Sequence, residues 1–278
     1  VEVEQPFNVP SLRKVLKTRS WQIYSGDIPF VNRFFLDGDV GMHVAFSGTV
    51  LDRRSDDGPT IKPEVVEAGG AGRYGVDCTL RCDASDIVST EPFQVPYIVF
   101  SFDLETSIEH ETVLCAAACV ENLETGKREV FSYRGTEQEI LEGLTATVQA
   151  TDPDIITGYN IANFDIPYLL NRSKALKVDD RFGLWGRIRG QQATMRESTF
   201  SSSAYGKRNS IQTTIQGRCI FDLITYMRRN HKLSSYSLNA VSAHFLKQQK
   251  EDVHHSIISD LQRGDDADRR RLAVYCLK

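Results

Sequence analysis

The stretch YIVFSFDLE, residues 97–105, combines an apolar run with two carboxylates at its end. Continuous apolar and β-branched residues predict a buried central strand. Alternate side chains of a strand project from one face, so Asp103 and Glu105 are expected to point the same way. Such a pair at the mouth of a sheet can hold Mg²⁺ or Mn²⁺, because these ions prefer carboxylate oxygen and keep open positions for water and phosphate.

The Asp-x-Glu pattern is weak evidence when it stands alone. A chain with 37 acidic residues among 278 contains about one such pattern by chance. By itself the pair therefore favours a solvated strand end, and a metal site needs the support of further motifs.

The segments that follow the central strand alternate between strand and helix patterns. Apolar runs at 112–120 and 128–133 flank a turn at Gly126 and predict a meander together with the central strand. Thr136 and Glu139 then form a capping-box pattern that starts a helix. The elements expected after the meander are a helix ending at Asp152-Pro153, a strand over 154–159, a helix over 166–177, a strand over 218–223, and helices over 235–248 and 265–278. This order predicts an α/β fold with a ribonuclease-H-like mixed sheet.

A polar insertion interrupts this order between residues 194 and 216. Two arms rich in Ser and Thr surround AYGK, residues 204–207, and predict an exposed β-hairpin that projects from the body. The hairpin lies in a basic segment, residues 172–218, which carries ten Lys or Arg against three Asp or Glu. This charge suits binding of a polyanion, and a solvated surface explains it equally well.

Residues 1–95 have weak periodicity and frequent Gly and Asp breaks, which predict an irregular α+β region. We place a domain boundary at Val95-Pro96, so that 96–278 form the second domain. The chain begins with neither Met nor a signal-peptide pattern, and we expect it to be an excised part of something larger.

Composition excludes several classes of protein. The net charge is −4, and no stretch approaches the roughly 20 apolar residues of a membrane span. The six cysteines have no C-x-x-C spacing and no neighbouring His cluster, so we expect reduced thiols in a reducing compartment rather than a zinc site.

Two further motifs carry candidate functional residues. GYNIANFD, residues 158–165, crosses from a strand end into a helix start, where α/β sheets commonly gather their active groups. Asp165 could also be a plain helix N-cap. LAVYCLK, residues 272–278, contains Tyr275, which by itself fits a core position as well as a catalytic one. Asp222 is expected to be a structural carboxylate rather than a ligand.

In order and spacing, these three motifs resemble the exonuclease motifs of family B DNA polymerases. SYSLNAV at 235–241 and QKEDV at 249–253 are similar to the replicative eukaryotic members of that family. DIPFVNRF at 27–34 resembles the segment that precedes their exonuclease. The resemblance implies a proofreading 3′→5′ exonuclease domain over 96–278, preceded by part of the polymerase N-terminal domain over 1–95.

The same resemblance implies a role for each motif residue. Asp103 would bridge two Mg²⁺ or Mn²⁺ ions, Glu105 would hold the ion that activates water, and Asp165 would support the second ion. Tyr275 would orient the water or the scissile phosphate, and Asn160 would place the 3′ strand.

The hairpin residues Tyr205, Lys207 and Arg208 resemble the strand-separating hairpin of the family. The implied partners are DNA and the rest of the polymerase chain, with a sliding clamp and accessory subunits that bind outside these residues, and the implied location is the nucleus. Family members carry Asp directly after the LAVYCLK motif, so we expect this chain, which stops at Lys278, to be nearly inactive.

Two other functions compete with this one. A free-standing exonuclease would share the carboxylates but would not need the polymerase-type N-terminal segment. A non-catalytic DNA-binding module would keep the basic segment without Asp103, Glu105 and Asp165, so these carboxylates argue against it.

Overall fold

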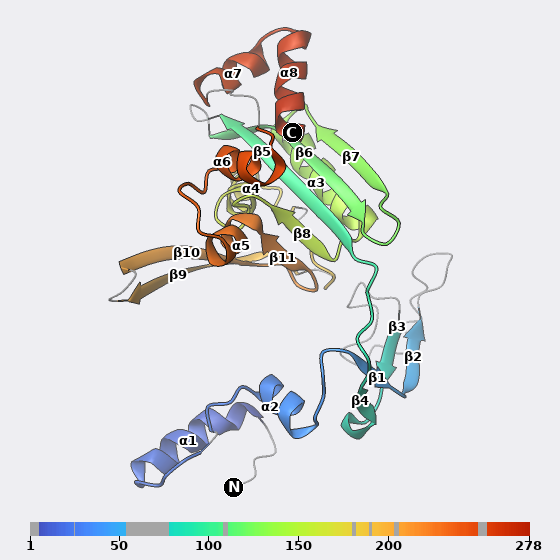
Figure 1. Cartoon of the computed structure of the whole chain (residues 1–278), viewed down its shortest axis with the longest axis vertical. Helices are drawn as coiled ribbons and strands as arrows, with labels where there is room; N and C mark the ends of the chain where they lie inside the picture. The colour runs from blue at the N-terminus through green and yellow to red at the C-terminus, as the bar shows by residue number, and fades with distance from the viewer. Residues whose placement is uncertain are drawn as a thin grey trace. The chain divides into compact units, whose positions relative to one another are not determined.

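The computed structural model describes residues 6–24, 26–53, 78–107, 111–179, 182–188, 191–202, 206–249 and 255–278. The chain divides into two compact units with a break between Gln94 and Val95 (Figure 1). That break lies next to the sequence change at Val95-Pro96.

The first unit consists of short elements. They are the 3-10 helices η1 (Pro6–Asn8) and η3 (Ala84–Asp86), helices α1 (Val9–Thr18) and α2 (Phe30–Asp37), and strands β1 (Val44–Phe46), β2 (Thr49–Arg53), β3 (Cys78–Arg81) and β4 (Ile87–Ser89). β1 pairs with β4, and β2 pairs with β3, both antiparallel.

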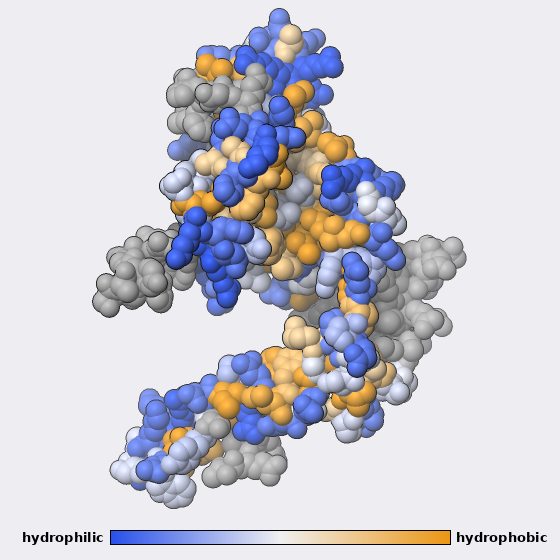
Figure 2. Space-filling view, in the orientation of Figure 1, coloured by the Kyte–Doolittle hydropathy of each residue, from blue (hydrophilic) through white to orange (hydrophobic). Residues whose placement is uncertain are grey.

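Apolar side chains of the first unit are largely exposed. Among its residues whose burial is described, Val40 is the only buried apolar side chain. Phe30 and Leu36 of α2 are 62% and 69% exposed, and Figure 2 shows hydrophobic surface gathered at this helix. The described part of this unit therefore contributes little core of its own.

The second unit contains a five-stranded mixed sheet with the strand order β11-β8-β5-β6-β7. Its strands are β5 (Ile98–Ser107), β6 (Thr112–Asn122), β7 (Arg128–Tyr133), β8 (Ile155–Gly158) and β11 (Cys219–Asp222). β5, β6 and β7 pair antiparallel, which confirms the predicted meander. β8 runs parallel to both β5 and β11, so the sheet is mixed, as expected.

The two faces of this sheet have separate cores. Phe100, Phe102 and Leu104 of β5 pack with the buried side chains of α3 (Glu137–Thr151) and α4 (Asp165–Ala175). Cys115 and Ala117 of β6 instead pack with α7 (His255–Arg263) and α8 (Asp266–Leu277). Because strand side chains alternate, the odd-numbered positions of β5 face α7 and α8.

Helix boundaries follow the capping chemistry of the sequence. Thr136 and Glu139 form the predicted capping box of α3, which ends at Asp152 with a left-handed φ of 44°. Ser237 caps α6 (Leu238–Leu246), a shorter helix than the expected 235–248. Asp165 is the first residue of α4 and Phe164 is the N-cap, so the alternative of Asp165 as a plain N-cap is wrong.

Two helices were not predicted from the sequence. α5 (Leu223–Asn230) follows β11 directly, where we expected a strand that continued to residue 223. α7 contains two adjacent isoleucines, which are only moderate helix formers, and Ile258 and Leu261 pack against α8. Tertiary burial rather than propensity accounts for α7.

The predicted hairpin is present. β9 (Thr194–Ser202) and β10 (Gly206–Thr214) pair antiparallel along their whole length, from Gly206 opposite Ser202 to Thr214 opposite Thr194.

Candidate metal centre

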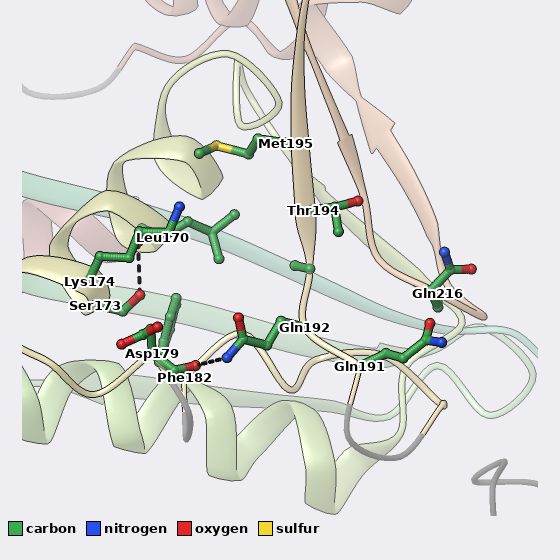
Figure 3. A pocket seen from close by; sticks show the side chains of 11 residues that line it. Leu170, Ser173, Lys174, Asp179, Phe182, Gln191, Gln192, Thr194, Met195 and Gln216 are labelled. Carbon is green, nitrogen blue, oxygen red and sulfur yellow. Dashed lines mark hydrogen bonds between the residues drawn. The ribbon is translucent and has the colours of Figure 1, made fainter.

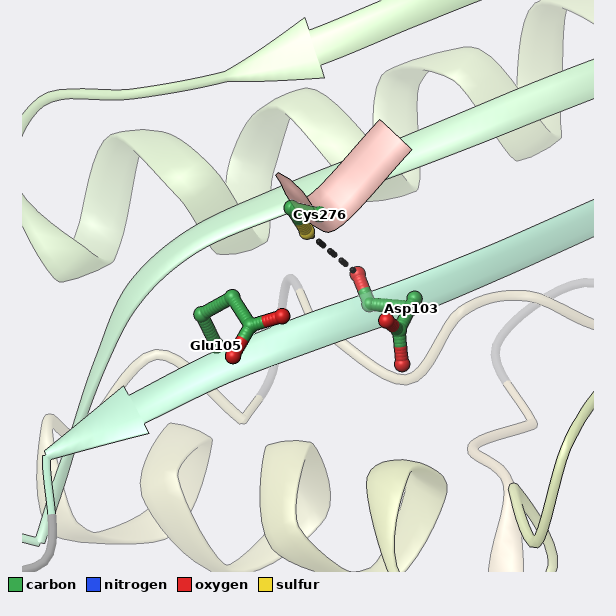
Figure 4. Close-up of side chains that lie close together, drawn as sticks. All are labelled: Asp103, Glu105 and Cys276. Carbon is green, nitrogen blue, oxygen red and sulfur yellow. Dashed lines mark hydrogen bonds between the residues drawn. The ribbon is translucent and has the colours of Figure 1, made fainter. Parts of the chain in front are cut away.

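β5 brings the first two candidate ligands together. Asp103 and Glu105 occupy alternate positions of β5, on the face that α8 covers, and Glu105 is only 6% exposed. One ligand atom from each of Asp103, Glu105 and Cys276 lies within 4.8 Å of the other two (Figure 4). The predicted shared orientation of the two carboxylates is therefore present.

Asp165 reaches the same strand from the start of α4. β5 pairs with β8 only over residues 99–101, and beyond that point the backbone amide of Leu104 hydrogen-bonds to the Asp165 carboxylate. Asp165 is 3% exposed. Burial first, and the negative charge of Asp103 second, raise the pKa of Asp165 to about 8.

The turn that carries Asp165 needs special backbone geometry. A Cβ at Gly158 would lie 2.8 Å from the carbonyl oxygen of Phe102, so glycine allows β8 to end close against β5. Asn160 has a left-handed φ of 68°, which asparagine tolerates better than most residues. The second motif begins with GYN, residues 158–160, so it supplies glycine at the close approach and asparagine at the left-handed position.

Cys276 is a site residue that sequence reasoning missed. Its Sγ donates a weak hydrogen bond to the backbone oxygen of Asp103 at 3.5 Å. Contact with the Cys115 thiol, burial and the charges of Asp103 and Glu105 all raise the pKa of the Cys276 thiol. The thiol therefore stays protonated beside the carboxylates. Its only signal in the sequence was its place next to Tyr275.

Tyr275 lies in the last turn of α8, directly before Cys276. It is half-buried and packs against the second core cluster, among residues of β6 and α7. The role of Tyr275 stays a prediction.

The hairpin residues are placed only by their backbone. Lys207 and Arg208 lie on β10 opposite Ser201 and Phe200. Tyr205 lies outside the described residues. The Asn163 side chain accepts a hydrogen bond from the Ile211 amide at 3.4 Å, which joins the second motif to β10.

Part of the basic segment has a structural use. Arg172 forms two hydrogen bonds with Glu137, at 2.7 and 2.8 Å. Arg187 pairs with Asp152 and Asp154, and Arg218, whose side chain is 4% exposed, also pairs with Asp152. These three arginines are therefore neutralised by carboxylates, and the charge of the segment overstates the charge offered to a polyanion.

Asp222 is placed as the sequence predicted, as a structural carboxylate. It is 8% exposed and accepts hydrogen bonds from the backbone amides of Asn160, Ala162 and Ile224. It is not among the converging ligand atoms.

A cavity of about 570 Å³ opens elsewhere in the second unit (Figure 3). Its lining comes from α4, the segment after it, and the start of β9, and includes Leu170, Phe182 and Met195. It shares no residue with the carboxylate site.

The second motif and the hairpin fall within a segment that resembles a known family. Residues 108–241 match the family model described as DNA polymerase family B, exonuclease domain. The match contains Asp165 and the hairpin, whereas Asp103, Glu105 and Tyr275 lie outside it. This part of the chain belongs to the exonuclease domains of the family B DNA polymerases.

Within that family, the chain is similar to catalytic subunits of DNA polymerase delta. It is 40% identical over 293 residues to the subunit of Arabidopsis thaliana, a match that covers 95% of this chain and 25% of the relative. It is 42% identical over 295 residues to the subunit of Bos taurus, a match that also covers 95% of this chain and 25% of the relative. The chain thus spans about a quarter of the length of these curated relatives.

A solved structure supports the fold class. The family B DNA polymerase from the archaeon Pyrobaculum calidifontis matches with a TM-score of 0.66 and 22% identity, over 99% of this chain and 33% of that chain. The expected ribonuclease-H-like α/β fold is confirmed. Within the described residues, no helix has the length and apolar character needed to cross a bilayer.

Proposed function

We propose that this chain carries the 3′→5′ proofreading exonuclease domain of a delta-like replicative DNA polymerase, which hydrolyses the 3′-terminal phosphodiester of DNA. The convergence of Asp103 and Glu105 on one face of β5, with the buried Asp165 close enough to Asp103 to feel its charge, carries the proposal. In this proposal residues 96–278 form the exonuclease domain, and residues 1–95 are part of the polymerase N-terminal domain.

The donor set fits hard divalent cations. Asp103 and Glu105 offer carboxylate oxygens close together. Burial first, and the charge of Asp103 second, raise the pKa of the nearby Asp165. Carboxylate oxygens are hard ligands, which favours Mg²⁺ or Mn²⁺ over softer ions. When bound, two such ions activate the attacking water and stabilise the leaving oxygen.

The residues of the chain would divide the remaining tasks. Asp103 and Glu105 would hold the ions, and Asp165 would support the second ion as a carboxylate. Tyr275 orients the water or the scissile phosphate through its hydroxyl, and Asn160 places the 3′ strand. Lys207 and Arg208, together with Tyr205, contact the DNA backbone.

The proposed partners are DNA and the remainder of the polymerase chain. Exposed apolar side chains on α2 support the second partner, because contiguous apolar surface commonly marks a contact with protein. A sliding clamp, accessory subunits and a nuclear location are proposed from the likeness to delta catalytic subunits alone.

The test is a nuclease assay with single-stranded DNA labelled at either end. Both this chain and a version extended past Lys278, with the segment that follows the matched region in a delta relative, are assayed in Mg²⁺ or Mn²⁺. We expect the extended version to release mononucleotides from the 3′ end and to lose this activity in EDTA. Digestion from the 5′ end, or full activity in EDTA, would contradict the proposal.

A further inference from the structure

Both carboxylate oxygens of Asp222 accept hydrogen bonds from backbone amides. Oδ1 accepts hydrogen bonds from Asn160 at 2.8 Å and from Ile224 at 3.1 Å, and Oδ2 accepts one from Ala162 at 3.0 Å. The bond from Ile224 caps α5. The other two reach across from β11 to the turn that follows β8.

That turn forms one hydrogen-bonded unit as far as Asp165. The carbonyl of Asn160 accepts hydrogen bonds from the amides of Asn163 and Phe164, at 3.2 and 3.0 Å. α4 begins at the next residue, Asp165. Because Asp222 holds the amide of Asn160, it fixes the end of the unit from which Asp165 projects.

The turn also needs an external anchor for a physical reason. Asn160 adopts a left-handed φ, a conformation that costs a non-glycine residue free energy and persists where surrounding contacts determine it. Two charge-assisted hydrogen bonds from a buried carboxylate are the stronger kind of such contacts. β11 and β8 lie in register here, with Asp222 opposite Gly158, so the anchor sits directly beside the turn.

We infer that Asp222 is a positioning residue for the hydrolysis of the DNA 3′ end: through the backbone of residues 160–165 it sets the placement of Asn160 and Asp165. The inference rests on the proposed function. Asp222 accepts hydrogen bonds from three backbone amides and is not among the converging ligand atoms, so its role is assigned to the turn and not to metal binding.

The test compares Asp222→Ala and Asp222→Asn in the chain extended past Lys278. Asparagine keeps the oxygen that serves Asn160 and Ile224 and loses the acceptor for Ala162, so it rescues part of the effect. Ser237→Ala is the matched control, because it removes an N-cap hydrogen bond from α6 and no bond to the turn.

We expect Asp222→Ala to lower kcat about a hundredfold, the scale of a misplacement of roughly 1 Å. Mn²⁺ affinity should fall by about tenfold at most, and less than in Asp103→Ala, since the variant keeps the proposed carboxylate ligands. Hydrogen exchange at the Asn160 and Ala162 amides should accelerate. Asp222→Asn should fall between wild type and Ala in rate, and Ser237→Ala should keep the wild-type rate.

Three outcomes overturn the inference. If Asp222→Ala keeps the wild-type kcat although hydrogen exchange at the Asn160 and Ala162 amides is faster, Asp222 has no positioning role. Loss of Mn²⁺ affinity as large as in Asp103→Ala makes Asp222 a ligand instead. An extended chain that carries no substitution and shows no metal-dependent 3′ nuclease activity overturns the proposed function, and the positioning role with it, whatever the exchange data show about the turn.

Discussion

The carboxylates of Asp165 and Asp103 lie close enough for the charge of one to raise the pKa of the other. Asp165 is also almost fully buried, and burial is the larger of the two causes. The folded chain therefore holds a proton on Asp165 up to a pH of about 8, whereas an unfolded chain loses it near pH 4.

The first prediction concerns stability against pH in metal-free buffer. Between about pH 4 and 8 the folded state binds a proton that the unfolded state lacks, so stability falls as pH rises, by up to ~1.4 kcal/mol per pH unit. Asp165→Asn removes this dependence. Urea unfolding at pH 5.5 and 7.5, with chelator present, should show a loss of about 2 kcal/mol in wild type that is absent from the variant.

The control for this experiment is Asp266→Asn, whose wild-type side chain is 99% exposed. It should keep the wild-type pH dependence. Identical slopes in wild type and Asp165→Asn would show that Asp165 is ionised in the folded chain.

The second prediction is that Asp103→Ala with Glu105→Ala abolishes 3′ nuclease activity without unfolding the domain. Removal of partners outside the ligand shell already costs about 10- to 100-fold, so loss of two proposed ligands should cost more than about a hundredfold. Removing two like charges should leave thermal stability unchanged or raise it. Nuclease rate, Mn²⁺ calorimetry and the Tm measure these effects, and a near-wild-type rate would place the ions elsewhere.

The third prediction concerns the hairpin. Lys207→Gln with Arg208→Gln should weaken DNA binding and reduce the slope of log K against log salt by up to about 0.9 for each lost phosphate contact. Hydrolysis of a short single strand should change little. The matched control is Lys127→Gln with Arg128→Gln, the same dipeptide at the β6–β7 turn, where both cations pair with glutamates.

DNA binding measured at several salt concentrations distinguishes the β9–β10 hairpin from the β6–β7 turn. If both double variants change the slope equally, the effect comes from net charge and the β9–β10 hairpin is not a specific DNA element.

The fourth prediction concerns the ion pair of Glu137 and Arg172, whose side chains are 10% and 21% exposed. Glu137 also accepts a hydrogen bond from the Val113 backbone amide at 2.8 Å, so it links α3 to both α4 and β6. Glu137→Gln leaves the arginine partly buried without its partner and should cost about 1–3 kcal/mol of unfolding free energy.

The exposed pair of Arg33 and Asp37 provides the comparison, because its side chains are 52% and 63% exposed. Asp37→Asn should cost less than about 1 kcal/mol. Urea unfolding measures both costs, and equal values would mean that burial does not set the strength of the Glu137 pair.

Local sequence determined most of the sheet and half of the candidate site. The alternation along residues 97–105 placed Asp103 and Glu105 on one face, and Thr136 with Glu139 fixed the start of α3. These features could be predicted because each depends on residues within a few positions, through strand periodicity or a single helical turn.

The tertiary structure decided which groups surround those carboxylates. Cys276 hydrogen-bonds to the backbone oxygen of Asp103, which is 173 residues away in the sequence. Asp222 hydrogen-bonds to the Asn160 amide, which is 62 residues away. Arg172, Arg187 and Arg218 likewise find carboxylates 33 to 66 positions away. The sequence shows which residues carry charge, but folding determines which amides, thiols and opposite charges lie next to each of them. Burial and these neighbours then determine whether a carboxylate is available to a metal ion, like Asp103, or hydrogen-bonded to the backbone, like Asp222.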